Sequence, residues 1–80
     1  MTAIEALEQM ALEFEQRRAK LSSAAACARI DARRAQTDAA NRAASVFASE
    51  LQVQINELTW AIDRLRERAR SMRSGATEAA

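Results

Sequence analysis

Residues 51–72, LQVQINELTWAIDRLRERARSM, decide the fold of this chain. In this stretch, apolar side chains recur at alternating intervals of four and three residues. This spacing is the heptad repeat of a coiled coil. It therefore predicts a helix that packs one stripe against a second helix, supplied by the same chain or by another copy. The stripe consists of Leu51, Ile55, Leu58, Ile62, Leu65, Ala69 and Met72.

The first half of the chain carries a second heptad stripe, bulky at its start and then almost entirely alanine. The 80 residues include no Pro and a single Gly, and Ala, Arg, Glu, Leu and Gln are good helix formers. The predicted fold class is therefore all-α. The second stripe consists of Ile4, Leu7, Ala11, Phe14, Arg18, Leu21, Ala25, Ala28, Ala32, Ala35 and Ala39.

The two stripes are out of phase, which predicts a turn between them. Equivalent core positions recur every seven residues up to Ala39, but the next one, Ala48, comes nine residues later. Thr37, Asp38 and Asn41 lie in this interval, and these residue types favour the ends of helices. The sequence therefore predicts an antiparallel, coiled-coil-like hairpin of two helices.

Capping residues suggest where each helix begins and ends. Thr2 and Glu5 form a capping box at the start of the first helix. Gly75 is expected to stop the second helix, because glycine readily adopts the left-handed conformation that ends helices. The whole chain is then one helical-hairpin domain. Its expected parts are helix 1 at about 3–36, a turn at about 37–41, helix 2 at about 40–74 and a frayed tail at 75–80.

Charge alternates along the chain in four blocks and supports this folding. Acidic residues alone occur in 1–16 and 43–63, whereas bases predominate in 17–42 and 64–74. A fold-back near residue 40 brings each block against one of opposite sign. Flanking heptad positions whose numbers add to 81 should then face each other across the hairpin. The expected pairs are Glu8–Arg73, Glu15–Arg66, Ser22–Thr59, Arg29–Gln52 and Gln36–Ser45.

An alternative gives nearly the same contacts. One unbroken helix of about 70 residues, roughly 105 Å long, could pair antiparallel with a second copy. The phase slip near residue 40 favours the hairpin. A core this rich in alanine is thin, so the hairpin is also expected to assemble, as a homodimer that forms a four-helix bundle.

Residue types that perform chemistry are nearly absent. The chain has no His and no Tyr, and its one cysteine, Cys27, has no neighbouring base to activate it. We therefore expect no catalytic residue, no metal site and no cofactor. The lone cysteine suits a reducing compartment, and no apolar run approaches the length of a membrane span. A cytoplasmic location follows as the expectation.

Apolar residues outside the stripes point to an interface. Val46, Val53 and Trp60 recur every seven residues on the side of helix 2 that faces away from the hairpin seam, and Phe47 lies beside them. Exposed apolar stripes on small proteins usually mark contacts with other proteins, and Trp is a frequent anchor there. This stripe could close a homodimer or dock on a different protein, and the sequence leaves both open.

Arginines form the other noticeable group. Arg29, Arg33, Arg64, Arg68 and Arg70 are candidates for a basic contact patch. A net charge of only +1 argues against nucleic acid as the partner, and solvated or paired arginines are the simpler interpretation. Arg18 occupies a core position and is expected to extend outward to Glu57 or Asp63.

The predicted function is therefore non-enzymatic. The sequence fits a small adaptor, chaperone or inhibitor that binds a partner protein through exposed helix faces. The alternatives are a nucleic-acid-binding or regulatory protein that uses the Arg clusters, and a structural subunit of a larger helical assembly. Arg outnumbers Lys by 11 to 1 and 20 residues are Ala, a bias typical of GC-rich bacterial or phage genomes.

Overall fold

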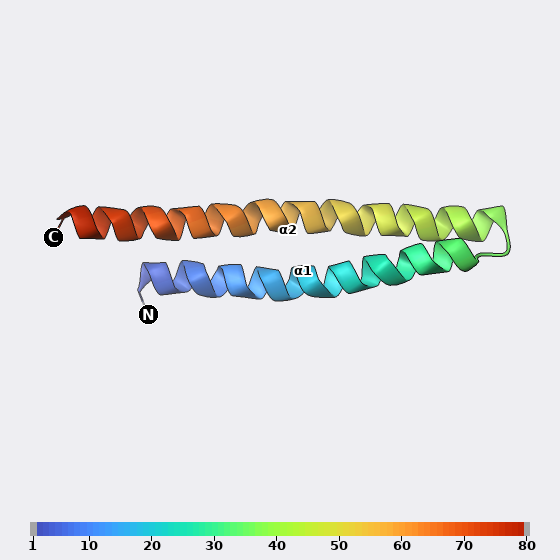
Figure 1. The fold of residues 1–80 in the computed structure, drawn as a ribbon, viewed down its shortest axis with the longest axis horizontal. Helices are drawn as coiled ribbons and strands as arrows, with labels where there is room; N and C mark the ends of the chain where they lie inside the picture. The colour runs from blue at the N-terminus through green and yellow to red at the C-terminus, as the bar shows by residue number, and fades with distance from the viewer. Residues whose placement is uncertain (1, 80) are drawn as a thin grey trace.

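The computed structural model describes the backbone of residues 2–79 and the side chains of residues 2–75. The chain forms two α-helices, α1 (Ala3–Arg34) and α2 (Asp38–Ala79), joined by a short turn. They run antiparallel along one another, with both termini at the same end and α2 reaching past the start of α1 (Figure 1). The hairpin measures 65 × 17 × 12 Å. The predicted antiparallel hairpin is confirmed, and the single unbroken helix is wrong.

The start of α1 is as the sequence predicts. The hydroxyl of Thr2 accepts a hydrogen bond from the backbone N–H of Glu5 at 3.1 Å, and the Thr2 carbonyl accepts one from the N–H of Ala6 at 3.0 Å. These bonds satisfy two N–H groups in the first turn, which has no preceding turn to bond with. Thr2 is therefore the N-cap that fixes the first residue of α1.

The turn is shorter and earlier than predicted. It spans residues 35–37, because Ala35 leaves the helix in an extended conformation and Thr37 already caps α2. The Thr37 hydroxyl accepts a hydrogen bond from the N–H of Ala40 at 3.1 Å. Asn41, expected as a turn residue, lies in α2, and its side-chain amide donates to the carbonyl of Ala32 at 2.7 Å. Asn41 thus satisfies a carbonyl at the end of α1 and ties the two helices together.

The end of α2 also differs from the prediction. The helix continues through Gly75 to Ala79 instead of stopping at residue 74, so the predicted helix end is wrong. Glycine ends a helix only where the backbone turns left-handed, and no described residue has a positive φ. The last residue of the expected tail, Ala80, lies outside the described residues.

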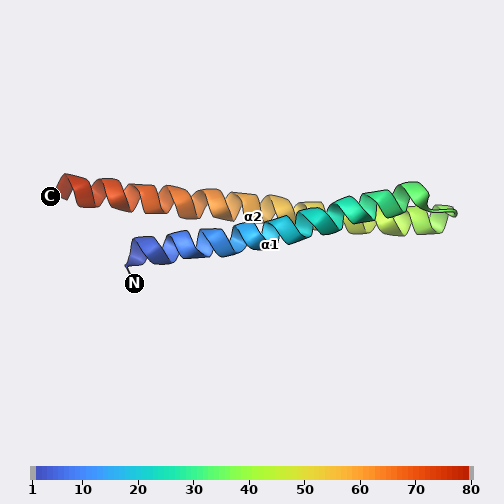
Figure 2. The same ribbon diagram turned by 60° about the horizontal axis from the view of Figure 1, so that its bottom comes forward.

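The core is a narrow seam in which α2 contributes the large side chains and α1 mainly alanine. Ile62 is 1% exposed and is the largest fully buried side chain among the described residues, and Leu51 is also buried. In the turned view of Figure 2, α1 passes across α2 at a shallow angle, as in a coiled coil. Alanine lets the helices approach closely. The buried alanines are Ala11, Ala25 and Ala28 of α1 and Ala48 and Ala69 of α2.

Three predicted cross-hairpin pairs are confirmed. Glu8 pairs with Arg73 and Glu15 with Arg66, and the Arg29 guanidinium donates to the Gln52 side-chain oxygen at 2.7 Å. Both ion pairs are partly exposed, so each stabilises the fold by only about 0–1 kcal/mol. We expect their main effect to be the selection of the register. The other two predicted pairs, Ser22–Thr59 and Gln36–Ser45, form no hydrogen bond between described side chains.

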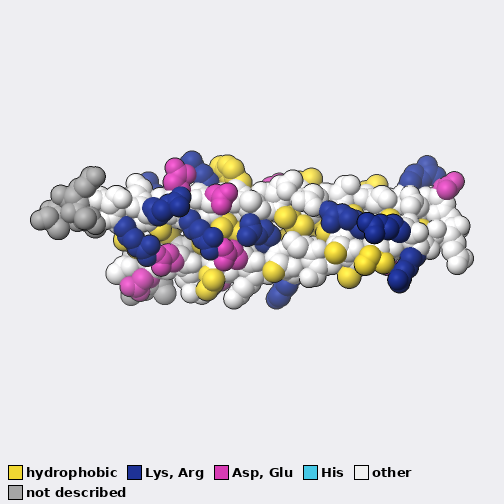
Figure 3. All heavy atoms as spheres, viewed as in Figure 1, with side chains coloured by type: hydrophobic (Ala, Val, Ile, Leu, Met, Phe, Trp, Pro, Cys, Tyr) yellow, Lys and Arg dark blue, Asp and Glu magenta, His cyan; other side chains and the backbone are white. Residues whose placement is uncertain are grey.

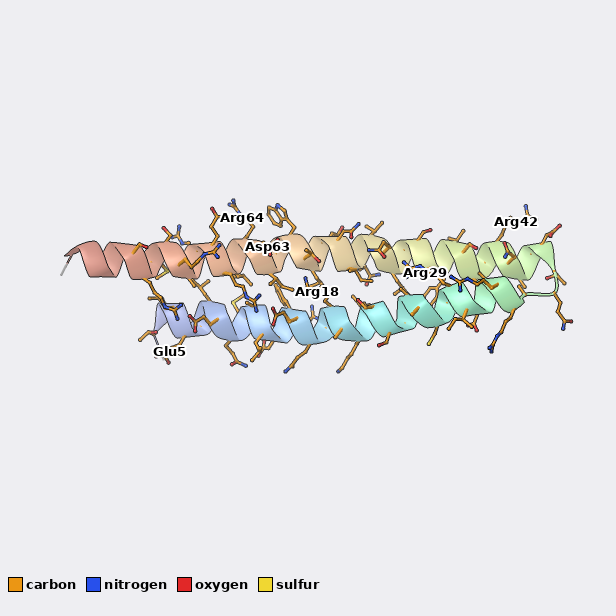
Figure 4. The ribbon with its side chains drawn as sticks, viewed as in Figure 1. Glu5, Arg18, Arg29, Arg42, Asp63 and Arg64 are labelled. Carbon is orange, nitrogen blue, oxygen red and sulfur yellow. The ribbon has the colours of Figure 1, made fainter. Side chains whose placement is uncertain are left out.

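Arg18 finds a different partner from the one predicted. Its Nη1 donates to the Thr59 hydroxyl at 3.1 Å, and this hydroxyl donates in turn to the Ile55 carbonyl at 2.9 Å. Figure 4 shows Arg18 between the two helices. Glu57 and Asp63 occupy positions farther from the seam, so the nearer Thr59 takes the guanidinium. The hydrogen bond keeps the polar end of Arg18 satisfied at a core position.

Candidate protein-binding surface

Four large apolar side chains lie exposed along the side of α2 that faces away from α1. Val46 is 56% exposed, Phe47 52%, Val53 57% and Trp60 67%. Val46, Val53 and Trp60 are seven residues apart, so they follow one another at intervals of roughly 10.5 Å along the helix. We call these four residues the outer stripe of α2. The exposure that the heptad pattern predicts for them is present in the structure.

Trp60 is held by a neighbouring arginine. The Arg64 guanidinium carbon lies 5.5 Å from the centroid of the indole, one helical turn further along α2. Figure 4 shows Arg64 on the side of α2 opposite α1. A cation–π contact at an exposed site stabilises by about 0.5–1 kcal/mol. Arg64 therefore restrains the indole while leaving most of its surface open.

A shallow, open hollow lies between Val53 and Trp60. Its other walls are Asn56, Glu57 and Ala61. The small side chain of Ala61 leaves room next to the indole, so the surface is notched rather than flat. The sequence pattern did not predict that these three residues line a hollow, because Asn56 and Glu57 occupy ordinary exposed positions and Ala61 a half-buried flanking one. The sequence signal for the hollow was their closeness to Trp60: Asn56 and Glu57 lie four and three residues before it, and Ala61 follows it directly.

Carboxylates accompany the outer stripe. Glu50, Glu57 and Asp63 are the charged residues between positions 43 and 63, and no base occurs in that interval. All three are exposed, and none makes a hydrogen bond or ion pair with a described residue. The surface around Val46 and Val53 is therefore acidic, and Arg64 is the base that lies against Trp60 at the far end of the stripe.

The predicted basic patch does not form one surface. Arg29 bonds Gln52, and Arg33 lines a shallow groove near the hairpin tip beside Ala48. Arg64 lies 16 residues beyond Ala48 along α2, roughly 24 Å away by helical rise. Arg70 lines a separate groove near the chain termini together with Glu5 and Glu8, and Arg68 is exposed on the same half of α2.

The face of the hairpin in Figure 3 shows the same separation. Lys and Arg side chains gather mainly towards the tip and towards the end with the termini, where acidic side chains lie among them. Arg66 and Arg73, in the second group, are paired with carboxylates of α1. Arg66 and Arg73 thus face acids of their own chain, whereas Arg29 faces the Gln52 amide and Arg64 the Trp60 ring.

Metal-ligating side chains do not cluster among the described residues. Within residues 2–75, no three His, Cys, Asp or Glu side chains lie together as metal ligands would, and Cys27 is an exposed free thiol. Neither helix, over its described length, combines the length and the apolar character needed to cross a membrane. Comparisons of the chain with protein-family models, with curated proteins and with solved structures find no match.

Proposed function

We propose that this chain is a non-enzymatic protein-interaction module that binds a partner protein through the outer stripe of α2. The observation that carries the proposal is the exposure of Val46, Phe47, Val53 and Trp60, each more than half open to solvent. The hairpin seam is filled by other residues, so folding leaves each of these four side chains more than half exposed. Apolar residues that recur along one exposed face are typical of interfaces, and Trp is enriched among binding hot spots.

The shape of the hairpin suits an adaptor, chaperone or inhibitor. A rigid helix presents the outer stripe in a fixed geometry, so little conformational entropy is lost when a partner binds. The restraint of Trp60 by Arg64 acts in the same direction. The exposed thiol of Cys27 is best kept reduced, so we place the protein in the cytoplasm.

We also propose that two hairpins associate into a four-helix bundle through a different flank. Met10 of α1 is 44% exposed and Phe47 of α2 is 52% exposed, and both occupy the heptad position opposite the flank with the Glu–Arg pairs. Ala24 and Ala61 occupy the same position and would let a second hairpin approach closely. In such a dimer Phe47, at the edge of the outer stripe, would lie in the dimer contact, and the partner would bind the other three residues of the stripe, Val46, Val53 and Trp60.

Nucleic-acid binding through the arginines has weaker support. Two of the arginines near the termini are paired with Glu8 and Glu15, and Arg29 and Arg33 line a groove separate from the one that Arg70 lines. A role as a structural subunit of a larger assembly would use the same outer stripe, with further copies as the partner.

Cys27 offers a way to test the main proposal. It is the single cysteine and is exposed on α1, so the chain can be immobilised through it with α2 facing outward. Extract from the source cells is passed over the parent chain, over Trp60→Glu and Val53→Glu variants, and over a Ser23→Glu control. Ser23 is exposed at the equivalent heptad position of α1. We expect the same protein on the parent and the control, and its loss from both stripe variants. Retention on both stripe variants would refute the proposal.

A further inference from the structure

Two carboxylates alternate with the apolar side chains of the outer stripe. Glu50 follows Val46 by four residues and precedes Val53 by three, and Glu57 stands in the same relation to Val53 and Trp60. Residues three and four apart are neighbours on the surface of a helix. One face of α2 therefore presents apolar and acidic groups in turn over about two heptads.

These carboxylates lack the charge partners that comparable residues have. Glu8 and Glu15, which are also seven residues apart, each pair with an arginine across the hairpin. Glu50 and Glu57 make no hydrogen bond or ion pair with any described residue. No Lys or Arg lies three or four residues from either of them. Both carboxylates are exposed, so they are open to basic groups of a binding partner.

We propose that the outer stripe binds a basic amphipathic helix of a second protein. This inference rests on the protein-binding function proposed above and adds the chemistry of the partner. Apolar side chains seven residues apart on the partner pack along Val46, Val53 and Trp60. Lys or Arg side chains beside them face Glu50 and Glu57. Complementary charge of this kind selects the partner and accelerates association more than it adds affinity.

The hollow between Val53 and Trp60 indicates where the partner is anchored. The hollow between Val53 and Trp60 has Ala61 at one side and Glu57 at another. An apolar side chain can enter it against the indole, while a basic residue one turn away on the partner reaches Glu57. A helix groove that receives spaced apolar anchors is a recurrent mode of peptide recognition.

The α2 helix of a second copy is a poorer occupant of this face. An antiparallel pairing that buries all three heptad-spaced residues sets Val53 against Val53 and Val46 against Trp60 of the second copy. Glu50 then lies opposite Glu57 of the second copy, and the symmetry repeats this contact of like charges. A parallel pairing sets Glu57 beside Asn56 of the second copy and gives neither glutamate a base. Both arrangements leave the acidic edge unmatched, whereas a basic helix matches it.

Trp60 provides the measurement. It is the single Trp of a chain without Tyr, so its emission maximum reports this face directly. Two synthetic helical peptides of three heptads, both free of Trp, share the same heptad-spaced leucines and differ only in having Lys or Glu at the flanking positions. We expect the Lys peptide to shift the Trp60 emission to shorter wavelength and to bind about tenfold more tightly than the Glu peptide. Equal binding of the two peptides would overturn the inference.

Charge reversal on the protein supplies the matched control. Glu50→Lys combined with Glu57→Lys should invert the preference, so that the Glu peptide binds more tightly than the Lys peptide. Glu13→Lys combined with Asp31→Lys makes the same change in net charge on exposed residues of α1 and should leave the preference for the Lys peptide intact. If both double variants shift the preference equally, net charge rather than this face determines binding, and the inference fails.

The inference and the proposed function fail in different ways. If the captured partner is lost from Trp60→Glu but retained in full by the Glu50→Lys, Glu57→Lys variant, the stripe binds proteins but not through the acidic edge. If Trp60 of the isolated chain is already shielded, and Val53→Glu converts a dimer to a monomer in sedimentation, a second copy occupies the face. Either result overturns the basic-helix assignment, whereas retention of the partner by Trp60→Glu and Val53→Glu refutes the proposed function itself.

Discussion

The guanidinium of Arg64 lies over the indole of Trp60, with its central carbon 5.5 Å from the ring centroid. Both residues belong to the same exposed face of α2, four positions apart, so the contact needs no other element of the fold. It gives the most exposed aromatic side chain of the described residues a defined orientation before any partner arrives. This relationship leads to the first of four predictions.

Arg64→Ala should make the indole of Trp60 more accessible without unfolding the protein. The change removes one cation–π contact, so the free energy of unfolding should fall by less than about 1 kcal/mol. Acrylamide quenching of Trp60 fluorescence should become more efficient, because one face of the ring is uncovered. Arg68→Ala, on the same exposed helix but without a contact to Trp60, is the control and should leave the quenching unchanged.

Ala25→Leu should destabilise the hairpin. Ala25 is 0% exposed in the seam between the helices, and overpacking a buried site costs about 1–3 kcal/mol. Its neighbour Ala26 is exposed, so Ala26→Leu makes the same chemical change outside the seam and should alter stability by less than about 0.5 kcal/mol. Urea unfolding followed by circular dichroism measures both. Equal effects of the two substitutions would contradict the close packing of the seam.

The Glu15–Arg66 pair should show its contribution in a charge swap. Glu15→Arg and Arg66→Glu each place like charges across the hairpin and should lower the free energy of unfolding by about 0.5–1 kcal/mol. The double variant restores opposite charges and should recover most of that loss. A coupling energy of zero in this double-mutant cycle would mean that the pair has no part in selecting the register.

Asn41→Ala should loosen the tip of the hairpin. Its side-chain amide donates to the Ala32 carbonyl at 2.7 Å and so joins the end of α1 to the start of α2. Loss of one such hydrogen bond costs about 1 kcal/mol. Hydrogen exchange at residues 32–37 should accelerate, whereas Ser49→Ala, an exposed change two turns further along α2, should not affect the tip. Unchanged exchange in Asn41→Ala would show that the turn is held by Thr37 alone.

Much of the fold could be predicted because the heptad pattern determines it. The contacts of Glu8 with Arg73 and of Glu15 with Arg66 follow from counting positions on either side of the turn. The turn itself was placed two residues too late, because several neighbouring residues could each cap α2 and only the folded backbone selects Thr37. Gly75 gave a false stop, because its backbone freedom permits a helix end but does not impose one.

The candidate surface was predictable in outline and less so in detail. The exposure of Trp60 follows from its heptad position, since a residue on the back of the helix cannot reach the seam. The hollow beside Trp60 was not predicted, because it depends on the side-chain directions of Val53 and Asn56 as well as on the small size of Ala61. The long side chain of Arg18 could reach several acceptors, so sequence spacing could not identify Thr59 as its partner.

The extended shape of the hairpin, 65 Å long and two helices wide, has a consequence for how it opens. Each layer of the seam contacts only the layers next to it, as in a repeat protein, so the molecule can unzip in steps rather than all at once. A contact near the tip joins residues that are close in sequence, so it closes a short loop. The contact between Glu8 and Arg73 closes a loop of more than 60 residues, at a greater entropic cost. Opening therefore begins at the end with the termini and proceeds towards the tip. The segment of α2 from Val46 to Trp60 is among the later parts to open. It therefore stays packed against α1 while the end with the termini opens and closes.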